Sequence, residues 1–276
     1  MTYWTAILLG LVQGAAEFLP VSSSGHLSIL QNFLHIGLPE DQLLFDVLLH
    51  LGTLAAVILA FWNDVRTLFS EGLCMVHLRK LRRGQKPDRL KRRMILFIIL
   101  GTLPLLAVVF IKDAVESLYS NTFFIGFAFI LTGVLLFAAD RMGHGNKSEK
   151  SATLGDILIV GLAQAVAVTP GLSRSGTTIS VGMLRGFDRN FAVRFSFLLS
   201  IPAVLGANIL TLIDAVQAGV NASLLPMYLA GVAAAFVSGY VSIYLLRMLV
   251  QRGRFGGFAY YCWGAGLVTL ILSLVA

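Results

Sequence analysis

The chain has 276 residues, of which 57% are hydrophobic and 13% are charged, and its formal net charge is +7. A soluble domain carries about 25% charged residues, so this composition excludes a soluble globular enzyme. Uncharged runs such as residues 195–213 and 255–276 meet the requirement of about 18 apolar residues for crossing a bilayer. We therefore predict an all-α polytopic membrane protein, with residues 1–276 forming a single integral membrane domain.

The positive charge is concentrated in one segment. Residues 77–93 contain nine Lys or Arg and one Asp, and no aromatic residue lies between the charges to stack on bases. This pattern predicts a cytoplasmic loop, residues 63–90, beside an anionic membrane surface, and it disfavours nucleic-acid binding. With that loop inside, 19 of the 21 Lys and Arg lie on the cytoplasmic side and both termini lie outside. The predicted spans are about 46–62, 91–111, 122–140, 192–212, 225–249 and 257–275.

Two further apolar segments are too short or too interrupted to span. Residues 3–18 would form a helix of about 24 Å, against a hydrocarbon core of about 30 Å, and a polar run at 20–26 separates them from the apolar residues 27–35. The same shape recurs at 156–185, where residues 170–176 interrupt the apolar run. Irregular backbone is tolerated at this depth only when protein or a watery cavity surrounds it. We therefore predict two re-entrant helical hairpins.

The two hairpins belong to an internal duplication. A shift of 151 residues aligns Gly10, Gln13, Ser22, Ser24 and Gly25 with Gly161, Gln164, Ser173, Ser175 and Gly176. Three spans separate the hairpins, and because three is odd the repeats must have inverted topology. Repeat one covers about 1–140 and repeat two about 150–276. The hairpins should enter from opposite sides, with their tips meeting near the midplane.

Ionisable side chains within apolar segments usually mark function. Gln13 and Glu17 are four residues apart and share one helix face. Arg174 is the only cation deep in the apolar segments. It lies among hydroxyl side chains in a glycine-containing loop at the start of a predicted helix, and this setting predicts a site for phosphate or carboxylate. Three structural alternatives remain: a buried Glu17–Arg174 ion pair that joins the repeats, interhelical serine contacts, and a hydrogen-bonded core histidine at His26. Asp46, His50 and Asp64 lie near the ends of a predicted spanning helix, and we expect them either to have structural roles or to support the site residues without contacting the substrate.

The segments QGAAEFLPVSSSGH (13–26) and PGLSRSGTT (170–178) closely resemble the two signatures of the undecaprenyl-diphosphate phosphatase family, the bacterial lipid-carrier phosphatases linked to bacitracin resistance. The first signature here has an amide, Gln13, at its first position, which leaves Glu17 as the essential carboxylate. The resemblance implies hydrolysis of undecaprenyl diphosphate, a C55 polyprenyl diphosphate, to the monophosphate and inorganic phosphate, which recycles the carrier for cell-wall synthesis. It also implies a homodimer in the bacterial inner membrane with an active site that opens to the periplasm, and dependence on Mg²⁺ or Ca²⁺, which would contact Glu17 through the diphosphate.

The resemblance and the polar residues of the two tips define the predicted site. The predicted catalytic residues are Glu17, Ser23, His26 and Arg174, and the predicted substrate-binding residues are Gln13, Ser22, Ser24, Ser173, Ser175 and Thr178. The nucleophile is Ser23, His26 or a water molecule that His26 activates. A competing function is a lipid-phosphate flippase or anion transporter, because inverted repeats with broken helices are a common transporter design.

Overall fold

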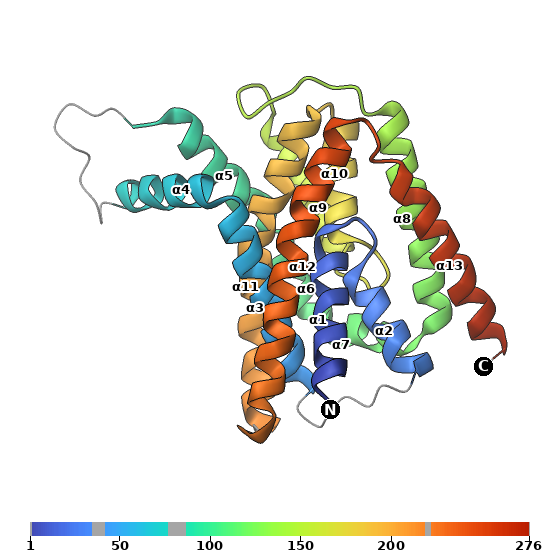
Figure 1. Cartoon of the computed structure of the whole chain (residues 1–276). Coiled ribbons are helices and arrows are strands. Elements are labelled where there is room, and N and C mark those ends of the chain that lie inside the picture. Colours follow the sequence, from blue (N-terminus) through green and yellow to red (C-terminus); the bar gives the residue numbers. More distant parts are fainter. Residues whose placement is uncertain (1, 35–41, 77–86, 219–221, 276) are drawn as a thin grey trace.

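The regular structure of the described residues is helical. The computed structural model describes residues 2–34, 42–76, 87–218 and 222–275. Its helices lie side by side in an elongated bundle from which α4 projects (Figure 1). The all-α class is thus confirmed for the described part of the chain. The helices are α1 (Tyr3–Phe18), α2 (Ser23–Leu34), α3 (Gln42–Ala60), α4 (Trp62–Met75), α5 (Arg89–Thr102), α6 (Leu105–Val108), α7 (Lys112–Ser117), α8 (Thr122–Met142), α9 (Leu154–Val166), α10 (Arg174–Leu184), α11 (Arg189–Ala218), α12 (Leu225–Gln251) and α13 (Gly257–Val275), with 3-10 turns at Val109–Ile111, Leu118–Ser120 and Ala222–Leu224.

Five helical stretches are long and apolar enough to cross a membrane: Arg89–Ser120, Thr122–Met142, Arg189–Ile213, Leu225–Gln251 and Gly257–Val275. A sixth candidate arises when α3 and α4 are taken together, although they meet at 88°. Several of these helices expose large apolar side chains on their outer surface, which suits lipid better than water. On α8 that exposed face carries Phe123, Phe127, Leu131 and Val134. The chain is a multi-pass helical membrane protein.

The expectation of one long loop over residues 63–90 is wrong in its first part, because Trp62–Met75 forms the helix α4. Its inward face buries Glu71, which accepts a hydrogen bond from Arg92 of α5 at 2.7 Å, while Trp62 and Phe69 on other faces are exposed. An amphipathic helix with this pattern stays helical when it packs on a neighbour. Residues 77–86, which hold much of the predicted basic loop, lie outside the described residues.

Both hairpins form, but their second helices begin earlier than the polar runs suggest. α1 ends at Phe18, as predicted, whereas α2 begins at Ser23 instead of about residue 27. In the second hairpin, α10 begins at Arg174, inside the run predicted to interrupt the helix. Ser22 and Ser173 explain both shifts, because a serine side chain that accepts a backbone N–H lets a helix begin within a polar segment.

Close helix contacts follow the internal duplication. α1 packs on α12 so tightly that a Cβ atom added at Gly10 would lie 2.2 Å from the Gly231 carbonyl oxygen. The equivalent Gly161 of α9 packs on α5, where an added Cβ would lie 2.6 Å from the Gly101 carbonyl oxygen. Small residues at such crossings allow two helix backbones to approach within a bilayer. Each hairpin is therefore held by a long helix of the other repeat.

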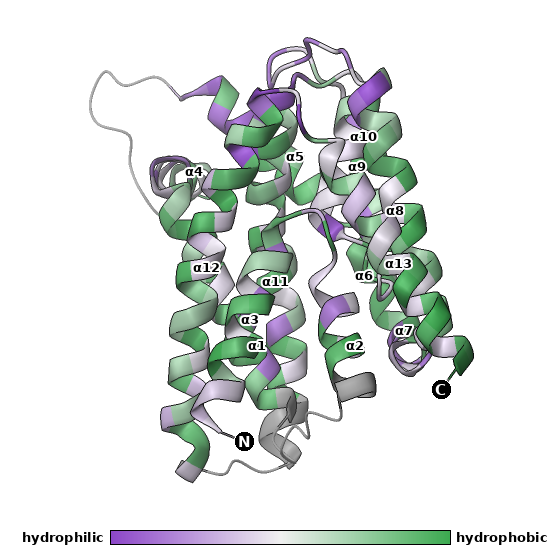
Figure 2. Cartoon of the chain, turned by 45° about the vertical axis from the view of Figure 1, so that its right-hand side comes forward, coloured by the Kyte–Doolittle hydropathy of each residue, from purple (hydrophilic) through white to green (hydrophobic). Residues whose placement is uncertain are grey.

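Charged residues gather at the end of the bundle opposite the N and C labels (Figures 1 and 2). Carboxylates at this end are paired, as in Asp64–Arg194 at 2.5 Å and Asp156–Lys147 at 2.9 Å. Hydrophilic residues become sparse along the middle of the bundle (Figure 2). The separation of charge matches the sidedness expected from the Lys and Arg distribution.

We predict that Gly10→Ala destabilises the α1–α12 contact, because the new methyl group would overlap backbone atoms that cannot rotate away. The thermal midpoint of the detergent-purified protein should fall by several degrees, corresponding to about 1–3 kcal/mol. Gly264→Ala is the matched control, since no atom lies within 4 Å of an added Cβ there. Equal midpoints for the two variants would contradict the packing described for α1.

Candidate active site

The turns of the two hairpins contact one another inside the bundle. α1 and α2 rise from the end where N lies, and α9 and α10 come from the opposite end (Figure 1). The Ser175 hydroxyl donates to the Leu19 carbonyl oxygen at 3.4 Å, and a Cβ atom added at Gly176 would lie 3.1 Å from Pro20. The two turns are thus in contact, which brings together residues about 150 positions apart; their depth in the membrane stays a prediction.

Equivalent serines cap the second helix of each hairpin in the same way. The backbone N–H of Gly25 donates to Ser22 Oγ at 3.2 Å, and the backbone N–H of Gly176 donates to Ser173 Oγ at 3.1 Å. Ser24 and Ser175 place their hydroxyls 3.3 Å from these capping serines. Two helix N-termini, which carry partial positive charge, are thereby directed into the region between the turns.

The first turn holds a strained backbone conformation. Ser22 has φ +68°, a left-handed conformation that costs a residue with a side chain on the order of 1–3 kcal/mol. In the second turn, Gly171 adopts φ +87° where its backbone lies against Ile125 and Ala128 of α8. Strain of this kind is retained where the surrounding structure fixes a functional geometry.

Glu17 lies at the centre of the contact. Its Oε2 atom accepts from Ser23 Oγ at 2.7 Å and from Gln13 Nε2 at 3.2 Å, and its Oε1 atom accepts from Arg174 Nη2. The Glu17 side chain is 9% exposed and that of Arg174 is 17% exposed. The structure therefore brings a carboxylate, a hydroxyl and a guanidinium from both hairpins into one buried network, as the sequence predicted.

Two buried polar atoms of this network have no hydrogen-bond partner among the described residues. They are Arg174 Nη1, which is a donor, and Gln13 Oε1, which is an acceptor. Buried groups without partners are uncommon in native proteins, and each requires an explanation. A phosphate oxygen placed against the guanidinium would satisfy Nη1 in the two-point geometry that arginine favours.

Ser23 and Arg174 occupy equivalent positions in the two repeats. Each is the first residue of its hairpin's second helix, and the 151-residue shift superimposes their positions in the sequence. Both side chains bond the same carboxylate, whereas the equivalent of Glu17 itself is Val168. The duplicated scaffold thus supplies two different chemical groups at related positions and a single acid between them.

His26, in the first turn of α2, is held by contacts that define its tautomer. Its Nδ1 atom lies 2.7 Å from the Ser22 carbonyl oxygen, which can only accept, so Nδ1 carries the proton. Its Nε2 atom then accepts from the Tyr261 hydroxyl at 2.7 Å. The imidazole also stacks on the Tyr261 ring, with centroids 5.7 Å apart, and meets Phe129 edge-on. The basic nitrogen of His26 is therefore Nε2.

The structure adds two residues that sequence reasoning had not placed in the site. His50, which was expected to be structural or to support the site residues, has its Nε2 atom 3.9 Å from Glu17 Oε2, and its Nδ1 atom bonds the Asp46 carbonyl oxygen at 2.8 Å. The sequence signal that could have placed His50 in the site was the segment FDVLLH (45–50), in which it is the last residue. Tyr261 lies within the last apolar helix, where an isolated tyrosine gives no sequence signal of its contact with His26.

Thr178 lies one helical turn beyond Arg174 and points elsewhere. Its hydroxyl bonds the Arg174 carbonyl oxygen at 2.9 Å and lies 2.6 Å from the Ser196 hydroxyl of α11. Ser22, Ser173 and Thr178 are all nearly fully buried. These three side chains fix the helices that carry the site, so any contact they make with a substrate requires movement.

A divalent cation would find few protein ligands here. The described residues contain no group of three His, Cys, Asp or Glu side chains arranged to hold a metal ion. Glu17 is the carboxylate of the network, and it fits a cation that takes its other ligands from a diphosphate and from water, as Mg²⁺ commonly does.

Comparisons with known proteins agree with this architecture. The family model of bacitracin resistance protein BacA matches residues 6–268 of the chain. An undecaprenyl-diphosphatase of Alkaliphilus metalliredigens is 40% identical over 277 residues, covering 100% of both chains. The undecaprenyl-diphosphatase of Syntrophotalea carbinolica is 43% identical over 274 residues, covering 99% of this chain and 100% of its own. That of Halothermothrix orenii is 38% identical over 275 residues, covering 99% of each.

Proposed function

Because the chain belongs to the bacitracin resistance protein BacA family, we propose that it hydrolyses undecaprenyl diphosphate to the monophosphate and inorganic phosphate. The product is the lipid carrier in the form that cell-wall synthesis reuses. The observation that supports this site is the Ser23–Glu17–Arg174 network, in which Arg174 Nη1 is buried and has no hydrogen-bond partner among the residues that the structure describes. A nucleophile, a base and a phosphate-binding cation are the parts that phosphoryl transfer requires.

The proposed membrane arrangement has six spanning helices and two re-entrant hairpins. The hairpins are α1–α2 and α9–α10, and the spans are the five apolar stretches together with α3. The charged end of the bundle faces the cytoplasm, and the site opens to the periplasmic side of the bacterial inner membrane. A homodimer forms part of the proposal through the family resemblance alone. The apolar polyprenyl chain lies along the helices while the diphosphate enters between the turns.

Arg174 binds the terminal phosphoryl group in this mechanism. Its guanidinium holds two phosphate oxygens and offsets the charge that they develop in the transition state. The backbone N–H groups at the start of α10 and α2 add positive potential on the same side. Substrate oxygens compete with Glu17 for the guanidinium, which leaves the carboxylate free to accept a proton.

Ser23 acts as the nucleophile. Its hydroxyl already donates to Glu17 Oε2 at 2.7 Å, so the carboxylate can take the proton as Oγ attacks phosphorus and the lipid monophosphate leaves. His26 is not the nucleophile in this mechanism, because the lone pair of its Nε2 atom accepts a hydrogen bond from the Tyr261 hydroxyl. His26 removes a proton from the water that hydrolyses the phosphoserine once the Tyr261 hydroxyl has released Nε2, and Glu17 returns its proton to Ser23 Oγ as the bond to phosphorus breaks. A divalent cation, when bound, would be held by Glu17 and would offset diphosphate charge.

A lipid-phosphate flippase or anion transporter remains the second candidate, because oppositely inserted hairpins that meet within the bundle are also a transporter design. Phosphate release from farnesyl diphosphate in detergent separates the two functions. That assay contains no compartments, so it detects hydrolysis but no transport.

We predict that Glu17→Gln and Arg174→Ala each reduce kcat in the farnesyl diphosphate assay by about 100-fold or more, because one removes the base and the other removes the transition-state cation. The Glu71–Arg92 pair provides matched controls, since its glutamate is also 9% exposed and also paired with an arginine, but on α4 and α5. Glu71→Gln and Arg92→Ala should keep kcat within about twofold in the folded fraction. If the Glu17 and Arg174 variants lowered only the thermal midpoint and kept full kcat, the pair would be a structural link between the repeats.

We further predict that Ser23→Ala abolishes phosphoserine formation and reduces kcat by about 100-fold or more, while Ser24→Ala leaves kcat within about tenfold. The two serines are adjacent, so general disruption of the turn should affect both variants alike. Rapid acid quench with ³²P-labelled diphosphate detects the phosphoserine. A Ser23→Ala variant with wild-type kcat would assign the attack to His26 or water.

Chelation tests the proposed cation. EDTA should reduce hydrolysis to a small fraction of its normal rate. It should leave the thermal midpoint of the substrate-free protein unchanged, because the described residues form no complete metal site without the diphosphate. Restoration by Mg²⁺ or Ca²⁺ is expected. Full activity in EDTA would contradict the cation requirement, and a fall in the midpoint of the substrate-free protein would indicate a resident metal ion instead.

A further inference from the structure

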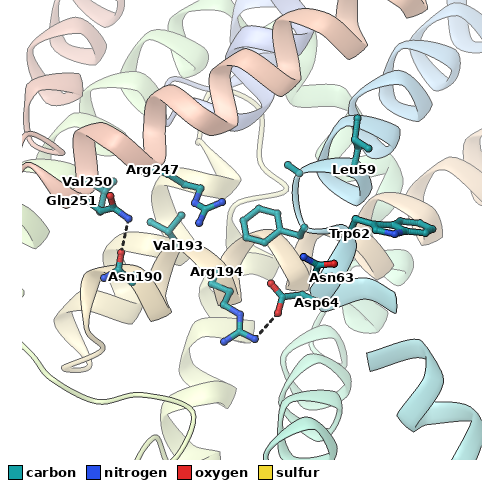
Figure 3. A pocket seen from close by; sticks show the side chains of 12 residues that line it. Leu59, Trp62, Asn63, Asp64, Asn190, Val193, Arg194, Arg247, Val250 and Gln251 are labelled. Atoms are coloured by element: carbon teal, nitrogen blue, oxygen red, sulfur yellow. Dashed lines mark hydrogen bonds and ion pairs between the residues drawn. The ribbon is translucent and has the colours of Figure 1, made fainter. Parts of the chain in front are cut away.

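A cavity of about 580 Å³ lies at the elbow between α3 and α4 (Figure 3), and none of its lining residues belongs to either hairpin. The N-terminal part of α11 and the C-terminal part of α12 form its other walls. Its size falls within the range of small-molecule sites. Its lining includes Leu59 and Trp62 at the elbow, Asp64 at the start of α4, and two arginines, Arg194 of α11 and Arg247 of α12.

Arg247 is the cation in this cavity without an acidic partner. Its guanidinium carbon lies 5.3 Å from the centre of the Phe61 ring, and no carboxylate of the described residues is within ion-pair distance of it. An arginine stacked on an aromatic ring keeps its charge and directs its N–H donors outward in the plane of the guanidinium. This side chain is therefore ready to bind an anion.

Arg194 of α11, unlike Arg247, is paired with carboxylates. It bonds Asp64 Oδ1 at 2.5 Å (Figure 3). It also lies 3.5 Å from Glu149 Oε1. Asp64 is thus neutralised by Arg194 and does not cancel the charge of Arg247. With Asp64 paired, the lining of the cavity carries a net positive charge that comes from Arg247.

The remaining lining combines amides with an apolar rim. Asn63, Asn190 and Gln251 offer amide groups, and Gln251 Nε2 bonds Asn190 Oδ1 at 3.0 Å. Leu59 and Trp62 are 51% and 53% exposed at the elbow, where the apolar α3 turns into α4. A tryptophan at such a boundary is typical of the membrane–water interface. The cavity therefore joins a cationic, hydrogen-bonding interior to a surface that suits acyl chains.

We propose that this cavity binds the headgroup of an anionic phospholipid from the leaflet at the charged end of the bundle. Arg247 takes the phosphate, the amides take headgroup hydroxyls, and the acyl chains leave along Leu59 and Trp62. A soluble phosphate ester has the same anionic group but makes no use of the apolar rim. The inference rests on the proposed membrane placement and not on hydrolysis, so its failure would leave the phosphatase proposal unaffected.

Native mass spectrometry of the detergent-purified full chain tests the site. The ligands are phosphatidylglycerol, phosphatidylcholine with the same acyl chains, and glycerol 3-phosphate as the soluble phosphate. The wild type should bind phosphatidylglycerol about fivefold more tightly than phosphatidylcholine, as expected for one arginine facing an anionic lipid. Arg247→Gln should remove that preference. Arg141→Gln is the matched control, because Arg141 stacks on Phe137 at 4.8 Å outside the cavity and should keep the preference.

Asn63→Asp is a second variant that leaves the Arg247–Phe61 contact in place and puts a negative charge into the cavity. It should also remove the preference, which keeps the test valid if Arg247→Gln does not fold. Folding is checked by the thermal midpoint of each variant. Equal phosphatidylglycerol binding by the wild type and either folded variant would overturn the proposal. Displacement of phosphatidylglycerol by an equal concentration of glycerol 3-phosphate would overturn the lipid as the ligand.

Discussion

The contact between Glu17 and Arg174 is the constraint on which the rest of the architecture depends. Charges are costly within an apolar layer unless they are paired and hydrogen-bonded, and here each partner comes from a different hairpin. The turns must therefore meet at one place with little freedom. Serine caps start the helices close to that point, and glycine contacts with α12 and α5 hold the hairpins at the required depth. Replacing such a pair by apolar residues is often neutral for stability, so its retention here is better explained by chemistry than by folding.

Duplication followed by divergence explains how a symmetric scaffold holds an asymmetric site. The repeats share their capping serines and their close glycine crossings, and both begin the second hairpin helix at the same relative position. At that position repeat one places the Ser23 hydroxyl and repeat two places the Arg174 guanidinium. The carboxylate between them comes from repeat one alone, because Val168 replaces it in repeat two. A single phosphoryl group thus meets a nucleophile from one repeat and a cation from the other.

The two ends of the molecule use arginine in different environments. Arg174 is largely enclosed, with its side chain 17% exposed, and it shares a carboxylate with a serine and a glutamine, so an incoming anion has to compete for it. Arg247 is stacked on Phe61 and has no acidic partner in the described part of the chain, so an anion can bind without displacing a carboxylate there. The first arrangement suits a reaction in which binding of the substrate releases a base. The second suits a ligand that is held but not transformed.

The sequence by itself determined the helical membrane class, the duplication, the two interrupted hairpins and the group of residues at their tips. These features depend on the local order of apolar and polar residues and on charge counting, and α1 ends at Phe18 as that pattern predicts. Only the tertiary structure decided where α2 and α10 begin, that residues 62–75 turn away as a helix, and that His50 and Tyr261 join the site. The Ser22 and Ser173 caps depend on backbone conformations that residue type alone does not specify. The contact between His26 and Tyr261 joins residues 235 positions apart, and no periodicity along the chain encodes such a distance, because it is set by how the helices pack.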